Sequence, residues 1–196
     1  MSNAHSNQPL YVQSGDPETT NDSPTKVFAI GQAGKFLTVK QPGPGGDAAG
    51  QAEEYRDKTY RYVLTDSTMA TNGYPGAVAW WADKSRYKVT TSPTATNRAQ
   101  VAGIFCITPT LGNWIFVQTG GPGTVKFIDA PTAAIAVGAA AIPSSTTAKA
   151  DCIAAGTAPG WPVLGYIASD PAAPTSPSGN AAAMTYVVDL FVPEMP

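Results

Sequence analysis

Two short apolar runs joined by a turn constrain the fold of this chain most. The runs Gln100–Ile107 and Asn113–Thr119 are rich in Val, Ile and Phe, and residues 108–112, Thr-Pro-Thr-Leu-Gly, separate them. Apolar runs of this length with a link that contains Pro and Gly indicate a β-hairpin. Neither run carries a carboxylate or a histidine, so the segment predicts a buried sheet face and not a reaction centre.

Glycine and proline extend the same signal along the chain. The 19 Gly and 18 Pro make 37 of 196 residues, and such residues break helices and build turns. Tyr60, Tyr62 and Leu64 alternate with Arg61 and Val63 in the period of two that a half-buried strand shows. Further strands are predicted at Val27–Ile30, Phe36–Val39, Ala77–Ala82, Arg86–Thr91, Thr124–Ile128, Pro162–Ser169 and Met184–Val192, with thin strands within 133–158.

These patterns predict an all-β, mostly antiparallel fold, a jelly-roll-like sandwich or barrel. At most one or two short helices are expected, the first over Ala48–Lys58 with Asp47 as its N-cap. Residues 26–196 are expected to form a single β-rich domain. Residues 1–25 lack apolar periodicity and predict an extended N-terminal arm. Its apolar residues Leu10, Tyr11 and Val12 are candidate contacts with a neighbouring subunit.

The charge and the residue composition do not indicate nucleic-acid binding, catalysis or metal binding. The formal net charge is −2 and 13% of residues are charged, so no basic surface for nucleic acid or for an anionic membrane is expected. The one histidine, His5, lies in the predicted arm, which argues against a catalytic triad. The spacing of Cys106 and Cys152 fits no zinc motif, and both buried thiols and a disulfide between them remain open. We therefore expect no enzyme activity, no metal site and no cofactor.

Tryptophans supply the other candidate contacts. Trp80 and Trp81 are adjacent, and adjacent residues of a strand point to opposite faces. One of them is expected in the core and the other at a surface or an interface, where Trp is over-represented. Trp114 flanks the turn of the predicted hairpin and is a third candidate contact. Exposed aromatic rings also stack on sugars, so a carbohydrate-binding surface is the alternative.

Two segments resemble the capsid decoration (cement) proteins of tailed bacteriophages. The shared features within Val101–Gly121 are a Val-Ala-Gly-Ile strand and a Gly-Asn-Trp-Ile-Phe-Val-Gln strand ending in Gly-Gly. The second segment is Trp161–Ser169, and the resemblance covers roughly residues 100–170. It implies a β-rich fold, self-association on the capsid, with a trimer slightly preferred over a dimer, and binding to the major capsid protein. It implies no catalytic residues.

The expected function is therefore that of a structural protein on the exterior of the virion. The polar N-terminus, MSNAHSNQPL, has no secretory pattern, so synthesis in the host bacterial cytoplasm is expected. Partners would be the major capsid protein and further copies of the chain, with no nucleic acid and no membrane. The alternative from another class is a carbohydrate-binding or host-attachment β-domain of a phage tail fibre.

Overall fold

The computed structural model describes nine segments of the chain and is all-β in these segments. They are residues 36–41, 56–69, 73–93, 100–129, 131–145, 148–154, 156–160, 162–169 and 185–192. Within them there is no helix, and the strands form one continuous hydrogen-bonded sheet. Its strands are β1 (Phe36–Gln41), β2 (Arg56–Thr65), β3 (Val78–Asp83), β4 (Lys88–Thr90), β5 (Val101–Phe105), β6 (Trp114–Lys126), β7 (Ala140–Pro143), β8 (Ala150–Ile153), β9 (Gly165–Ser169) and β10 (Thr185–Phe191).

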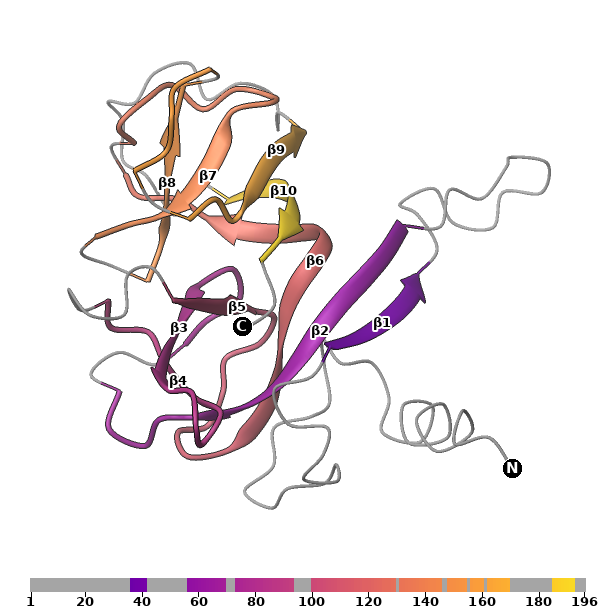
Figure 1. Cartoon of the computed structure of the whole chain (residues 1–196), viewed down its shortest axis with the longest axis vertical. Coiled ribbons are helices and arrows are strands. Elements are labelled where there is room, and N and C mark those ends of the chain that lie inside the picture. Colours follow the sequence, from indigo (N-terminus) through magenta and orange to yellow (C-terminus); the bar gives the residue numbers. More distant parts are fainter. Residues whose placement is uncertain are drawn as a thin grey trace.

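Five of these strands close into a small barrel. They follow the order β2-β4-β3-β5-β6, and pairing between β2 and β6 completes the ring. The pair β2–β4 is parallel and the other four pairs are antiparallel, so the barrel is mixed. Figure 1 shows it in the lower half of the molecule. The sequence left sandwich and barrel open, and the structure has the barrel.

The long strand β6 links this barrel to the rest of the continuous sheet, the part formed by β10, β9, β7 and β8, which we call the second sheet. Its first part pairs with β2, and from Gly120 onward it pairs with β10, after which β9, β7 and β8 follow. A parallel bridge between Phe127 and Ala150 brings β8 back to the chain just after β6. The second sheet, orange and yellow in Figure 1, therefore curls back toward the end of β6.

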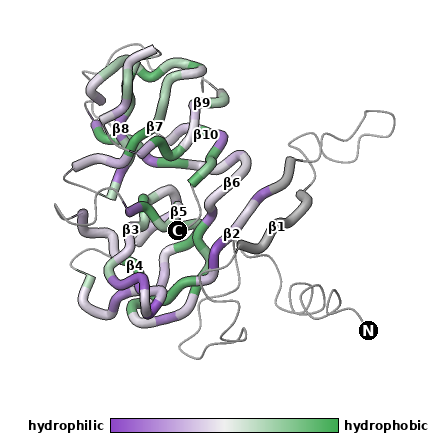
Figure 2. Tube along the Cα trace, in the orientation of Figure 1, coloured by the Kyte–Doolittle hydropathy of each residue, from purple (hydrophilic) through white to green (hydrophobic). Residues whose placement is uncertain are grey.

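One hydrophobic core serves both parts. A single cluster of buried residues includes Val63 and Ile115 from the barrel and Ile167 and Val188 from the second sheet. Hydrophobic residues accordingly occur along both parts of the tube in Figure 2. At Gly165 a side chain would overlap the backbone carbonyl of Asp189, so this glycine lets β9 approach β10 closely.

A second, smaller cluster lies on another face of β2 and β6. Tyr60, Tyr62 and Phe116 are buried there, with Trp114 and Cys106 packed against them. The ring of Tyr62 stacks on Trp114 at a centroid distance of 5.2 Å and lies 4.9 Å from that of Phe116. β2 thus buries tyrosines on one face and Arg61 and Val63 on the other, so the half-buried strand expected from the sequence is wrong, because both faces of β2 are covered.

Most sequence predictions of strands are confirmed, with two corrections. The expected strand Thr124–Ile128 is not separate, because β6 runs through Gly120–Gly123 without a turn and ends at Lys126. The expected helix Ala48–Lys58 is wrong at its end, where residues 56–58 begin β2 by pairing with β1. The earlier residues of that helix, the strand Val27–Ile30 and the N-terminal arm lie outside the described residues.

Candidate interaction surface

The outer face of β10 carries exposed apolar side chains. The strand alternates strictly: Tyr186, Val188 and Leu190 are buried, while Val187 and Phe191 are exposed. Burial of the first set is explained by the core, which lies beneath the second sheet. The second set is exposed, so two large apolar residues lie beside Thr185 and Asp189 on the side of β10 that does not meet the core.

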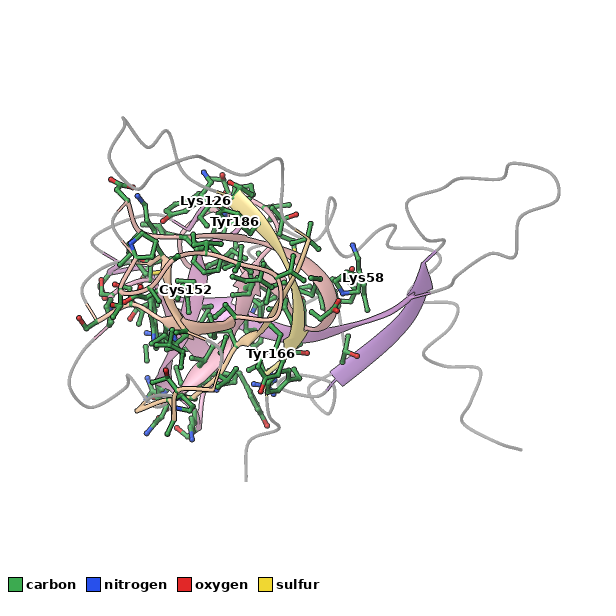
Figure 3. All side chains as sticks on the ribbon, turned by 90° about the horizontal axis from the view of Figure 1, so that it is seen from above. Lys58, Lys126, Cys152, Tyr166 and Tyr186 are labelled. Carbon is green, nitrogen blue, oxygen red and sulfur yellow. The ribbon has the colours of Figure 1, made fainter. Side chains whose placement is uncertain are left out.

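Strand β9 enlarges this exposed face. Tyr166 pairs in register with Asp189 of β10 and therefore points to the same side of the sheet as Val187 and Phe191. The exposed fractions are 50% for Tyr166, 47% for Phe191 and 36% for Val187. The Tyr166 and Phe191 rings lie 5.5 Å apart between centroids, inclined by 36°. We call Tyr166, Val187 and Phe191 the apolar face; Figure 3 labels Tyr166 beside β10.

The apolar face is distinctive within the described segments. Only four large hydrophobic side chains are exposed there, and three of them form this face. The fourth, Val137, is 60% exposed and precedes Gly138, whose N–H donates to the Ile167 carbonyl of β9 at 2.8 Å. Contiguous exposed apolar side chains mark interaction sites more often than single ones do. This surface is therefore the best candidate for contact with a partner.

Polar groups near this sheet are engaged locally. The Lys126 ammonium, opposite Thr185 in register, lies 4.7 Å from the centroid of the Tyr74 ring. Asp151 accepts hydrogen bonds from the backbone N–H and hydroxyl of Thr132, at 2.8 and 2.6 Å. Asp129 forms an ion pair with Lys149 at 2.8 Å. These contacts brace loops, whereas the exposed Asp189, opposite Tyr166 in register, places a carboxylate on the same side of β10 as Val187 and Phe191.

A cleft of about 240 Å³ lies at the junction of barrel and second sheet. Its lining includes Lys58, Phe105, Cys106 and Gln118. The Gln118 amide does not point a free donor into the cleft, because its Nε2 donates to the carbonyls of Gly120 and Pro122, each at 3.0 Å. Those bonds hold the glycine-rich middle of β6, so Gln118 has a structural role.

Titratable groups of the described segments form no candidate metal centre. No group of three or more His, Cys, Asp or Glu side chains there is arranged to hold a metal ion. Cys106 and Cys152 form no disulfide, and burial raises the pKa of the Cys152 thiol, with the nearby Asp151 carboxylate adding to the shift. A thiol with a raised pKa is a poor nucleophile at neutral pH.

The candidate contacts from the sequence fall in different places. Trp80 and Trp81 are 0% and 2% exposed, so the expectation that one of them lies at a surface or an interface is wrong. The core covers both sides of β3 up to Trp81, and the Arg61 guanidinium lies over the Trp81 ring, 5.4 Å from its centroid. Trp114 is half-buried against Tyr62, while residues 10–12 lie outside the described residues.

Sequence reasoning missed the apolar face. The sequence pattern that indicates it is the run Met184–Val192, in which Val187 and Phe191 interrupt the apolar–polar alternation of a strand with one solvent-exposed side. Such a run also fits a strand buried on both sides, and only the structure distinguishes the two. No partner for Tyr166 was visible, because β9 and β10 pair across fifteen intervening residues, 170–184.

Comparisons with known proteins add no family. No protein-family model, no curated protein and no solved structure matches this chain significantly. In the described segments, no helix has the length and apolarity needed to cross a membrane.

Proposed function

We propose that this chain is a virion structural protein that decorates the outer surface of a phage head and bridges subunits of the major capsid protein. The observation that carries the proposal is the apolar face formed by Tyr166, Val187 and Phe191. The resemblance of residues 100–170 to decoration proteins favours the same role. The chain acts as a homo-oligomer, a trimer in preference to a dimer, and needs no cofactor.

The apolar face suits a contact that is modest for each copy. A half-exposed aromatic ring can bury on the order of 100 Å² in a contact, or about 2.5 kcal/mol before the costs of association. Many copies on one shell make such contacts effective by avidity. A protein that binds only the closed shell lowers its free energy relative to a ruptured one.

The N-terminal arm completes the proposal. Residues 1–25 are polar, and Leu10, Tyr11 and Val12 are the apolar residues grouped within them. An arm that becomes ordered on a neighbouring subunit lengthens the contact, at an entropic cost for each residue fixed. Leu10–Val12 then act as the anchor.

The test is binding to purified capsids that lack this protein. Wild-type chain is expected to bind with saturation at a fixed number of copies per capsid subunit. The double variant Tyr166→Ser, Phe191→Ser is expected to bind about ten- to a hundredfold more weakly, because central aromatic contacts dominate interface energies. Val137→Ser, which alters an exposed apolar residue outside the defined face, is the matched control. Unchanged binding of the double variant would remove the apolar face from the proposal.

One observation favours a second function, glycan binding by a host-attachment domain. Tyr166 and Phe191 present two exposed rings 5.5 Å apart, with Asp189 paired in register beside Tyr166. Aromatic rings next to a carboxylate suit a sugar, which offers an apolar face and hydroxyl donors. Glycan binding by wild-type chain that is lost in Tyr166→Ser, without any binding to capsids, would favour this function over decoration.

A further inference from the structure

The cleft beside the middle of β6 contains a hydrogen-bond acceptor that the fold does not use. Gln118 lines the cleft and is only 3% exposed. Its Nε2 donates to the carbonyls of Gly120 and Pro122, each at 3.0 Å, and to that of Gly121 at 3.4 Å. Carbonyl oxygens only accept hydrogen bonds, so these partners fix which amide atom is the nitrogen. The amide oxygen, Oε1, has no donor within the described structure and is not sealed from solvent.

Neighbouring strands bring further side chains to the same face of the sheet as Gln118. Tyr60 of β2 is opposite Gln118, and Lys58 precedes Tyr60 by two residues, so Lys58 lies on that face. Ile104 of β5 is also opposite Gln118. A Cβ atom at position 123 would lie 2.9 Å from Gln118 Oε1, so Gly123 leaves the oxygen uncovered.

The rest of the lining combines one cation with apolar groups. Lys58 is the single charged residue of the lining in the described structure, and Figure 3 labels it where β2 leaves the barrel. Its ammonium has three N–H donors and pairs with anions. Pro75, Ile104 and Pro122 supply apolar contacts. A volume of about 240 Å³ is small for a ligand site, so these groups suit a small ligand with one negative charge.

We propose that the cleft binds a small carboxylate that carries an N–H group on the carbon next to the carboxyl, together with a short apolar side chain. The carboxylate pairs with Lys58, the N–H donates to Gln118 Oε1, and the apolar group packs on Pro75 and Pro122. An N-acylated amino acid has these three groups, and the C-terminal residue of a peptide has them too. This inference does not depend on the proposed function.

Titration of the free chain with small probes, followed by NMR without capsids, tests each group of the ligand. N-acetyl-leucine is expected to bind with a Kd of about a millimolar, because the contacts are few. N-acetyl-leucinamide lacks the carboxylate, and 4-methylpentanoate keeps the carboxylate and side chain but lacks the N–H. Each is expected to bind about fivefold more weakly. The peptide acetyl-Ala-Ala-Leu distinguishes the two sources: tighter binding than N-acetyl-leucine indicates a polypeptide end, and equal or weaker binding indicates a free acylated amino acid.

A charge variant tests the role of Lys58. Lys58→Met is expected to weaken binding of N-acetyl-leucine about fivefold and to leave binding of N-acetyl-leucinamide unchanged. Lys84→Met, in the turn between β3 and β4, removes the same charge outside the cleft and is expected to change neither affinity.

The thiol of Cys106 provides a measurement without any substitution, so it does not disturb the structural bonds of Gln118. Cys106 is half-buried and lines the cleft. N-acetyl-leucine at about five times its Kd is expected to slow alkylation of Cys106 by iodoacetamide about fivefold, because only unoccupied chain reacts. No binding of N-acetyl-leucine, equal binding of the three small probes, unchanged affinity of Lys58→Met, or an unchanged alkylation rate would each overturn the proposal. The expected results support it whether or not the chain binds capsids.

Discussion

Truncation of Phe127 is expected to destabilise the barrel and the second sheet together. Phe127 is fully buried and its ring meets that of Tyr186 edge-on, 5.4 Å between centroids. Its backbone bridges to Ala150, where β8 returns to the chain after β6. Replacing a buried Phe by Ala leaves a cavity and costs about 3–5 kcal/mol. For a chain of this size, that loss corresponds to a fall in Tm of about 6 to 20 °C.

The assay is urea unfolding of wild type and Phe127→Ala, followed by fluorescence and circular dichroism. One core joins the two parts, so both signals are expected to show a single coincident transition, shifted as a whole by the substitution. Val137→Ala changes an exposed side chain and should alter stability by less than about 0.5 kcal/mol. A loss below about 1 kcal/mol for Phe127→Ala, or two transitions of which only one moves, would refute the shared core and the expected single domain.

Three further outcomes are expected. Burial raises the pKa of Asp66, but hydrogen bonds from Thr68 and the charge of Lys88 outweigh this effect and lower the pKa below 3.8. Ionised Asp66 therefore stabilises the fold above about pH 4. The difference in stability between wild type and Asp66→Asn should close as the pH falls further. A gap that widened in acid would contradict this sign. The buried Cys152 thiol should react with a thiol reagent only on unfolding, and the half-buried Cys106 sooner; equal rates in the native protein would contradict their burial. Deleting residues 1–25 should leave the urea midpoint nearly unchanged and weaken capsid binding, and loss of folding would show that the arm belongs to the core.

The fold was largely predictable because short local sequence patterns indicate most of its strands. The hairpin at Gln100–Thr119 and the strand around Tyr62 each depend on neighbours in sequence, and both are present in the structure, although that strand is buried on both faces. The continuity of β6 was not predictable in the same way. Gly120–Gly123 reads as a turn locally, and it stays extended because Gln118 binds the carbonyls there and β10 pairs alongside.

The candidate surface was less predictable because exposure depends on distant segments. Trp80 and Trp81 read as one buried and one exposed residue, but covering both sides of β3 requires contacts with remote parts of the chain, such as the bond from the Val78 N–H to the Ala148 carbonyl. Conversely, the apolar sequence around Phe191 fits a buried side chain, but Phe191 is exposed. The residues of β10 alone do not indicate which side of the strand faces the core.

The central claim, that this chain stabilises a phage head from outside, is tested most directly by thermal rupture of capsids with and without it. Capsids that lack the protein are expected to be assembled but to release DNA at a lower temperature. Adding purified chain should restore the wild-type rupture temperature, with saturation at a fixed copy number per capsid subunit and without any cofactor. Equal rupture temperatures with and without the bound chain would contradict the claim.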